Sequence, residues 1–368
     1  MGAVSSIHRG SETAGTLALP GNLGLEWPQV SVIITCYNYA RYIEACLGSV
    51  QRQDYSRFEC IVVDDASTDG SAELVEAYLR KHQLEPRFRL VRRPANGGQL
   101  AAFRTGLEQC QGRFIVFVDA DDLLLEGFVS AHVQAHLDNF PVAFTSSNQY
   151  QINEAGEVVG GVHPDLYADN APQRVITRCL FNPSWVWATT SSMMFRRAAL
   201  EAIMPQAGAD EHFRRCADNY VCHFANLLSG SILMPEVLGC YRRHGENSFS
   251  KNPFFGGRMP TGNMGDHPRH AVVKSTVRDH ILANVQRFSS LFTEKGVPRL
   301  LAKITPPRAA AVMLLKALFL PNYPMPARMA LRLLIMSVMR YSGYWYRIFA
   351  KPASQVQFEF QVPSQIPG

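Results

Sequence analysis

The stretch Phe114–Asp122, FIVFVDADD, is a short apolar run that ends in three carboxylates. Its first five residues are Val, Ile and Phe with no alternating polar position, which is typical of a strand buried on both faces of a parallel sheet. Ligands of such sheets bind beyond the carboxyl ends of the strands. The stretch therefore predicts both a buried parallel strand and a functional site at its end.

Similar apolar runs alternate with amphipathic stretches on either side of it. The predicted strands are Val30–Thr35, Phe58–Val63, Phe88–Val91, Phe114–Val118 and Val142–Ser146. The predicted helices are Arg41–Arg52, Ser71–His82, Gln99–Cys110 and Gly127–Asp138. This alternation predicts an α/β fold, a Rossmann-like and mostly parallel sheet with flanking helices.

The charge of the chain is unevenly distributed. The net charge of the 368 residues is +5, but residues 1–270 hold 23 basic and 28 acidic side chains, whereas residues 271–352 hold 13 basic and two acidic ones. We expect a flexible N-terminal arm at 1–28, a catalytic domain at 29–250, a linker at 251–270, a basic amphipathic helical region at 271–352 and a tail at 353–368.

Eight cysteines are scattered through apolar segments without a C-x-x-C spacing, and the first thirty residues lack a basic segment followed by an apolar one. We therefore expect reduced core thiols and a cytoplasmic protein.

Polar residues follow four of the predicted strands. No G-x-G-x-x-G follows the first strand and no G-x-x-x-x-G-K-[ST] is present, which disfavours a nicotinamide cofactor and an ATPase-type phosphate loop. The cluster Asp119, Asp121 and Asp122 would suit Mg²⁺ or Mn²⁺, since these ions prefer oxygen ligands. A solvated acidic loop that caps the next helix is the alternative.

Four segments in order resemble the motifs of family-two inverting glycosyltransferases with a GT-A fold. They are Val30–Asn38, Ile61–Gly70, Asn96–Gly98 and Val118–Asp122, and the resemblance covers about residues 30–250. It implies a GT-A-type sheet with a C-terminal helical appendage, a nucleotide-diphosphate sugar as donor, and a divalent metal, Mn²⁺ or Mg²⁺, as cofactor.

The resemblance also implies roles for individual residues. The nucleotide-sugar-binding candidates are Thr35, Tyr37, Asn38, Asp64, Asp65, Asn96, Arg104, Asp119 and Ala120. The metal candidates are Asp119 and Asp121 of the Asp-x-Asp element, together with His244. In the family an Asn often follows the residue at the position of Arg104, and this chain has Thr105 there.

The catalytic base implied by the resemblance is Asp218, before an apolar helical pattern that starts at Tyr220. The family often has an acid just before this position, where the chain has Ala217, so Asp210 and Glu211 remain rivals. Asp218 could also be a helix N-cap. Trp185 and Trp187 could form a sugar platform or belong to the core.

The implied reaction is an inverting transfer to an acceptor hydroxyl, with a saccharide or lipid-linked acceptor, in polysaccharide or glycolipid synthesis. A nucleotidyltransferase and a non-catalytic nucleotide-sugar-binding scaffold are the alternatives. The basic region at 271–352 has no uninterrupted apolar run of spanning length. Its helices could contact an anionic membrane surface from the cytoplasm or pack on the catalytic domain; we expect no nucleic-acid partner, because no binding module accompanies the charge.

Overall fold

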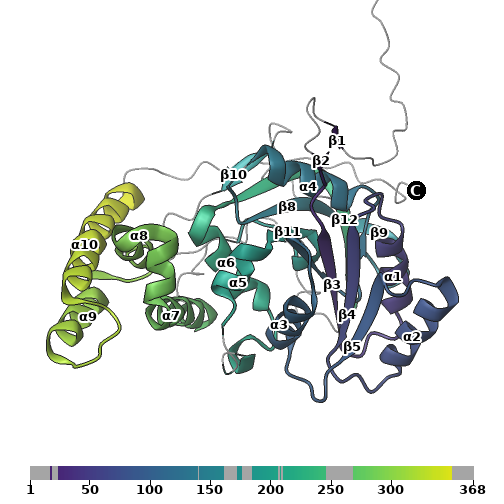
Figure 1. Cartoon of the computed structure of the whole chain (residues 1–368), viewed down its shortest axis with the longest axis horizontal. Coiled ribbons are helices and arrows are strands. Elements are labelled where there is room, and N and C mark those ends of the chain that lie inside the picture. The colour runs from purple at the N-terminus through teal and green to yellow at the C-terminus, as the bar shows by residue number, and fades with distance from the viewer. Residues whose placement is uncertain are drawn as a thin grey trace, which may run out of the picture.

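The computed structural model describes residues 17–18, 24–139, 141–160, 172–175, 185–205, 208, 210–245 and 268–349. They form a central sheet covered by helices on both faces, with a group of C-terminal helices at one side (Figure 1). Along the main path of the sheet the strands follow in the order β10 (Gln173–Val175), β12 (Ser231–Arg242), β8 (Phe144–Ile152), β11 (Met193–Arg196), β6 (Phe114–Asp119), β3 (Val30–Cys36), β4 (Phe58–Asp64) and β5 (Phe88–Arg92). Strands β6, β3, β4 and β5 are parallel neighbours, and β8 is parallel to β12, whereas β11 runs antiparallel to both β6 and β8.

The predicted elements of the first half are present. The strands are β3 (Val30–Cys36), β4 (Phe58–Asp64), β5 (Phe88–Arg92), β6 (Phe114–Asp119) and β8 (Phe144–Ile152). The helices are α1 (Ile43–Gln51), α2 (Ser71–His82), α3 (Gln99–Gln109) and α4 (Phe128–Asp138). The predicted α/β fold, with a mostly parallel sheet, flanking helices and C-terminal helices, is confirmed.

The second half adds the elements that complete the sheet. They are β7 (Leu123–Leu124), β9 (Val158–Gly160), β10 (Gln173–Val175), β11 (Met193–Arg196) and β12 (Ser231–Arg242), with helices α5 (Arg197–Ile203) and α6 (Ala217–Ser229) and short 3-10 turns at Thr190–Ser192 and Asp210–Phe213. Strand β12 pairs with β7 and β8, so the chain after α6 returns to the strand end that carries Asp121 and Asp122.

The apolar strands have no solvent-exposed face, because each strand contributes side chains to two hydrophobic cores, one on each face of the sheet. In β3, Ile33 packs on the side of α3, α5 and α6, whereas Val32 and Ile34 pack on the side of α1, α2 and α4. The same alternation places Ile115 and Phe117 of β6 on the first side. Successive side chains of a strand point to opposite faces, so burial of both faces requires a continuous apolar sequence.

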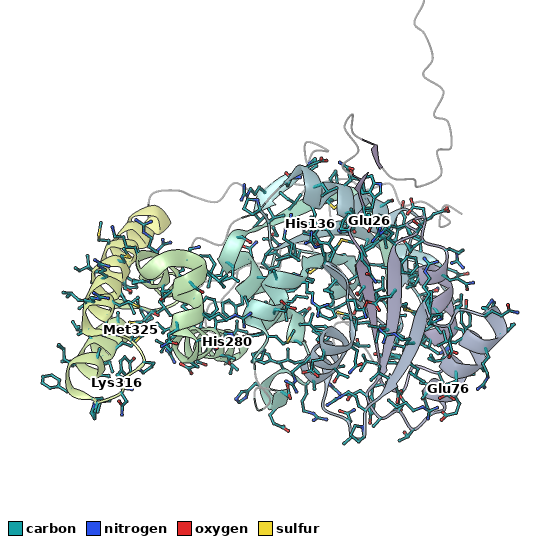
Figure 2. All side chains as sticks on the ribbon, viewed as in Figure 1. Glu26, Glu76, His136, His280, Lys316 and Met325 are labelled. Carbon is teal, nitrogen blue, oxygen red and sulfur yellow. The ribbon has the colours of Figure 1, made fainter. Side chains whose placement is uncertain are left out.

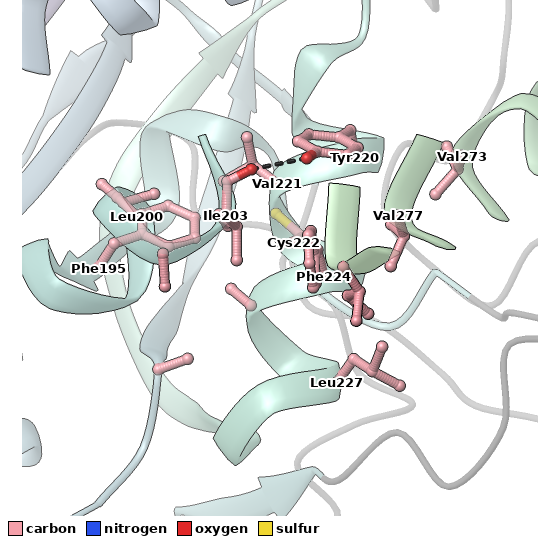
Figure 3. Close-up of a cluster of buried hydrophobic side chains, with 14 of the residues drawn as sticks. Phe195, Leu200, Ile203, Tyr220, Val221, Cys222, Phe224, Leu227, Val273 and Val277 are labelled. Carbon is pink, nitrogen blue, oxygen red and sulfur yellow. Dashed lines mark hydrogen bonds between the residues drawn. The ribbon is translucent and has the colours of Figure 1, made fainter. Parts of the chain in front are cut away.

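The C-terminal helices share the first of these cores. They are α7 (Pro268–Ala283), α8 (Val285–Leu301), α9 (Pro307–Phe319) and α10 (Ala327–Phe349). Val273 and Val277 of α7 belong to the same buried cluster as Phe224 of α6 (Figure 3). His280 lies where the helical group meets the sheet domain, and its Nε2 is 3.0 Å from the backbone oxygen of Ala202 (Figure 2).

Several predicted segments fall wholly or partly outside the described residues. Of the N-terminal arm, Leu17–Ala18 and Gly24–Leu25 form a short antiparallel pair, β1 and β2. The linker up to residue 267, the tail at 353–368 and Cys179 are outside the described residues. The seven cysteines within the described part are buried free thiols, as predicted. None of the helices described is both long and apolar enough to cross a bilayer.

Helix α4 places two imidazoles in the core. His132 and His136 are fully buried, and burial lowers the pKa of His136 to about 3 and that of His132 well below its usual value. His136 stacks on Phe114, and its Nε2 is 2.9 Å from the backbone oxygen of Met194. These groups remain neutral in the folded protein while they bind protons in the unfolded chain below a pH of about 6.5.

We predict that the free energy of unfolding falls as the pH decreases from about 6.5 towards 3, by up to about 1.4 kcal/mol per pH unit for each of these histidines. Because the folded pKa is lowered, the stabilisation is complete above the unfolded pKa and is lost towards acid. Urea unfolding at several pH values checks this. The His136→Gln variant should have a shallower pH dependence, and His82→Gln, on the exposed end of α2, should leave it unchanged. Equal slopes for both variants would contradict the assignment.

Candidate functional site

The parallel register brings the predicted polar residues to one edge of the sheet. Thr35 of β3 lies opposite Asp119 of β6, and Cys36 lies opposite Asp64 of β4. The hydroxyl of Thr35 donates a hydrogen bond to Oδ1 of Asp119 at 3.2 Å. The strand pairing alone therefore places three of the predicted residues, Thr35, Asp64 and Asp119, at one edge of the sheet.

Asp65 organises the loop that precedes α3. Its carboxylate accepts hydrogen bonds from the backbone N–H groups of Gly97 (3.0 Å) and Gly98 (2.7 Å) and pairs with the guanidinium of Arg93. Gly98 has a φ of 83°, and a side chain there would collide with the backbone of Arg214. The Asn-Gly-Gly segment is thus fixed by one carboxylate and requires glycine at its third position, Gly98.

Two carboxylates of the Asp-x-Asp element point to the same space. Burial, followed by the charges of Asp121 and Asp218, raises the pKa of Asp119 to about 7. Oδ2 of Asp121 is 2.8 Å from Nε2 of His244, whose ring packs against Tyr42 and Tyr39. A carboxylate whose pKa is raised by a neighbouring carboxylate favours a cation beside it.

The carboxylate of Asp122 attaches two other segments of the chain through hydrogen bonds. One of its oxygens accepts the backbone N–H of Arg242 at 2.8 Å, and the other accepts the hydroxyl of Ser191 at 2.7 Å. The Ser191 hydroxyl also accepts the backbone N–H of Asp119 at 3.1 Å. Both oxygens of Asp122 are used to attach β12 and the turn at Thr190–Ser192 to the acidic strand end, which the sequence did not indicate.

Gln99 joins the acidic strand end to helix α6. Its Nε2 donates to Oδ1 of Asp119 at 3.3 Å, and its Oε1 accepts the backbone N–H of Ala217 at 2.8 Å. Asp218 therefore lies one residue beyond a backbone group held by the same side chain that contacts Asp119. Asp218 is in the first turn of α6, one position inside the helix start, and Cys216 occupies the N-cap position. The N-cap alternative for Asp218 is wrong by this geometry.

The two rivals of Asp218 lie elsewhere. Asp210 forms a two-point ion pair with Arg104, with N–O distances of 2.8 and 2.6 Å. Glu211 is exposed. The ion pair attaches the turn at Asp210–Phe213 to α3, so in this structure Arg104 contacts a carboxylate of its own chain.

The candidate site lies in a cavity of about 520 Å³. Its lining includes the predicted residues Thr35, Tyr37, Asp65, Asn96, Asp119, Asp121 and Asp218. It also includes residues that the sequence did not single out, namely Gln99, Thr189, Thr190, Arg214, Arg215 and Tyr241. The two arginines supply positive charge for an anionic ligand. The two arginines could have been predicted as site residues, because they come just before Asp218 in the sequence. No local sequence pattern indicates Gln99 or the two threonines as site residues.

The remaining predicted residues lie outside this lining. Asn38 accepts the backbone N–H of Thr68, Asp64 accepts that of Ser67, and Ala120 donates its own N–H to the oxygen of Thr35. These contacts shape the loops behind the cavity wall. Trp187 is buried in the core and donates to the Ser231 hydroxyl, and Trp185 packs on it edge to face, so both indoles belong to the core side of the fold.

The composition of the donor groups fits a hard divalent cation. Among the residues that the structure describes, no three His, Cys, Asp or Glu side chains are grouped as a metal-holding set. Proteins nevertheless commonly bind Mg²⁺ or Mn²⁺ through one or two carboxylates when a bound phosphate supplies further oxygen ligands. Asp119 and Asp121 fit that pattern, with His244 beside Asp121.

Residues 31–204 match the family model described as Glycosyl transferase family 2. The predicted family resemblance is confirmed. An uncharacterized glycosyltransferase of Nostoc, alr2836, is 29% identical over 230 residues, which are 60% of this chain and 66% of the relative. The glycosyltransferase GlyG of Streptococcus pneumoniae is 31% identical over 105 residues, 28% of this chain and 34% of the relative. The chain thus spans less than two thirds of the length of either relative.

Among solved structures, residues 1–349 of Staphylococcus aureus TarS in complex with UDP-GlcNAc are similar to this chain with a TM-score of 0.48 and 17% sequence identity. The match covers 87% of this chain and 92% of the TarS fragment.

We predict that Asp65→Asn lowers the free energy of unfolding by about 3 kcal/mol, because it leaves the part-buried guanidinium of Arg93 without its charge partner. It should also increase hydrogen exchange at the amides of Gly97 and Gly98. Chemical unfolding and exchange measured by mass spectrometry check this. Asp138→Asn, on the exposed end of α4, is the control and should change neither quantity. Unchanged exchange in the Asp65 variant would refute the proposed anchoring.

Proposed function

We propose that this chain transfers a sugar from a nucleotide-diphosphate sugar to an acceptor hydroxyl, with inversion, in polysaccharide or glycolipid synthesis. The observation that carries the proposal is that Asp119, Asp121 and Asp218, which come from two distant segments, line one cavity together with the polar end of β3. The match of residues 31–204 to the glycosyltransferase family supports the same reaction class.

The donor nucleotide is proposed to lie across the ends of β3 and β4. The exposed ring of Tyr37, 44% accessible, offers a face for the base. In Asp65, Oδ2 accepts one hydrogen bond, from Gly98, and keeps a further lone pair for a ribose hydroxyl. Asn96, held by Arg214 through its side-chain oxygen, extends the same wall. Asn38, Asp64 and Ala120 would act by shaping the strand-end loops.

Asp119 and Asp121 are proposed to hold the divalent ion, Mn²⁺ or Mg²⁺, with His244 orienting the Asp121 carboxylate. The ion, when bound, offsets negative charge on the donor diphosphate and on the leaving nucleoside diphosphate. Arg214 and Arg215 add positive charge at the cavity wall. Arg104 is proposed to support this wall through its ion pair with Asp210.

Asp218 is proposed as the general base. It lines the cavity and lies close enough to Asp119 for its charge to raise the pKa of that group. Asp218 would accept the proton of the acceptor hydroxyl while that oxygen attacks the anomeric carbon from the side opposite the diphosphate, which inverts the configuration. Gln99 would fix the distance between the base and the diphosphate-binding end, because it contacts both Asp119 and the start of α6.

We propose a saccharide or a lipid-linked sugar as acceptor and a cytoplasmic location with contact to the inner face of the membrane. The described helices lack the length and apolar character needed for a span, so such contact would be peripheral.

We predict that Asp121→Asn and Asp218→Asn each lower sugar transfer by at least about 100-fold, because one removes a cation ligand and the other removes the base. The measurement is release of nucleoside diphosphate from a panel of nucleotide sugars with Mn²⁺ or Mg²⁺. Asp138→Asn is the matched control and should retain full turnover. Thermal unfolding of each variant separates loss of chemistry from loss of fold.

Three results would contradict parts of this proposal. Near-normal turnover by Asp218→Asn would remove that residue from the mechanism. Release of pyrophosphate would indicate a nucleotidyltransferase, and tight donor binding without any turnover would indicate a binding scaffold.

A further inference from the structure

Exposed apolar side chains are concentrated at the C-terminal end of the described chain. Of 14 large apolar side chains that are exposed among the described residues, 11 lie between Leu291 and Tyr341. The other three, Tyr37, Leu137 and Val159, are scattered over the sheet domain. Scattered apolar residues are ordinary on a protein surface, whereas a concentration of this kind marks an interaction surface.

Helix α9 exposes an apolar stripe at helical spacing. Val312, Leu315 and Phe319 follow at intervals of three and four residues, and Phe319 is 76% accessible. Residues at these intervals lie on one face of a helix. The opposite face, with Ala310 and Met313, is buried.

Helix α10 repeats the arrangement. Leu331, Ile335 and Val338 are exposed at intervals of four and three residues, whereas Ala330 and Leu333 are buried in the core. We call the exposed stripes of the two helices together the α9–α10 surface. It consists of Val312, Leu315, Phe319, Leu331, Ile335 and Val338.

Four basic side chains of these helices are exposed beside the stripes. Arg308 and Lys316 of α9 and Arg328 and Arg332 of α10 are all exposed. Arg308 and Lys316 are four residues from Val312 on either side, and Arg328 and Arg332 flank Leu331. The sequence contains no Asp or Glu between Glu294 and Glu359. The α9–α10 surface is therefore apolar with a purely basic border.

The position of the two helices leaves this surface accessible. Helices α9 and α10 lie at the end of the molecule farthest from β3, β4 and β5 (Figure 1). Lys316 lies at that outer end (Figure 2). The cavity with Asp119 and Asp218 belongs to the sheet domain, so a partner of the α9–α10 surface would not cover it.

We propose that the α9–α10 surface binds an anionic lipid bilayer, with the apolar stripes in the headgroup region and the basic side chains on anionic headgroups. Burial of apolar side chains and electrostatic attraction of Lys and Arg to anionic headgroups act together at such a surface. A second copy of the chain is the less favourable partner, because two identical faces would bring their basic borders together without acidic side chains to offset the repulsion. The absence of a bilayer-spanning helix among those described is consistent with binding in the plane of the surface.

This inference deepens the proposed membrane location by assigning it to named residues, and it does not depend on the proposed sugar transfer. Release of nucleoside diphosphate and vesicle binding are separate measurements, so failure of one is distinguishable from failure of the other.

Co-sedimentation of the full chain with phosphatidylglycerol vesicles and with phosphatidylcholine vesicles tests the proposal. We expect binding to the first, weakened by salt, and at least tenfold weaker binding to the second. The double variants Leu315→Ser with Phe319→Ser and Arg308→Glu with Lys316→Glu should each weaken binding by at least tenfold. Matched controls on other surfaces, Leu137→Ser on α4 and Arg80→Glu with Lys81→Glu on α2, should bind as the unchanged chain does.

Sedimentation velocity without lipid and thermal unfolding complete the test. Properly folded variants that bind like the controls would overturn the proposal, as would a wild-type chain that does not sediment with phosphatidylglycerol vesicles. Self-association that is lost in the Leu315 and Phe319 variant, without vesicle binding, would assign the surface to a second copy instead.

Discussion

Burial of carboxylates at one edge of a parallel sheet is the constraint on which the rest of the site depends. Asp64, Asp65, Asp121 and Asp122 are all buried there, and a buried carboxylate is costly unless hydrogen bonds or opposite charges compensate it. Three of them bind different segments: Asp65 fixes the Asn-Gly-Gly loop, Asp122 fixes the end of β12, and Asp121 contacts the His244 loop. The positions of these loops follow from the need to satisfy the carboxylates.

The same constraint separates structural acids from those free for chemistry. Both oxygens of Asp122 are used by the protein itself, through Ser191 and the N–H of Arg242. Within the described residues, the carboxylate of Asp119 accepts two long hydrogen bonds, from Thr35 and Gln99, and burial raises its pKa to about 7. An acid with weak internal compensation at a cavity wall is suited to a ligand that brings positive charge.

Much of this could be predicted from the sequence, because the signals were local. Continuous Val/Ile/Phe runs indicated strands buried on two faces, and the polar residues after them indicated the site edge. The contacts made by Gln99, Ser191 and Arg214 could not be predicted, since their partners are 20 to 118 residues away in the sequence. The ion pair of Arg104 with Asp210 has the same origin, and it also explains why Asp210 is a poor candidate for the base.

The uneven distribution of charge was visible from the sequence. Whether the basic region packs on the rest of the protein could be decided only from the arrangement of helices α7–α10. These helices share a core with α6, through Phe224 and Phe288, so the basic region is packed on the sheet domain. The two expectations for this region, packing and surface contact, apply to different faces of the same helices: the inner faces pack, and the exposed basic faces of α9 and α10 remain available.

The most direct test of the central claim is a crystal structure of the protein with Mn²⁺ and a nucleoside diphosphate. We expect anomalous scattering from manganese beside Asp119 and Asp121, with the nucleotide base near Tyr37 and with Asp218 facing the outer end of the diphosphate. Manganese and nucleotide bound outside the cavity lined by these residues would contradict it.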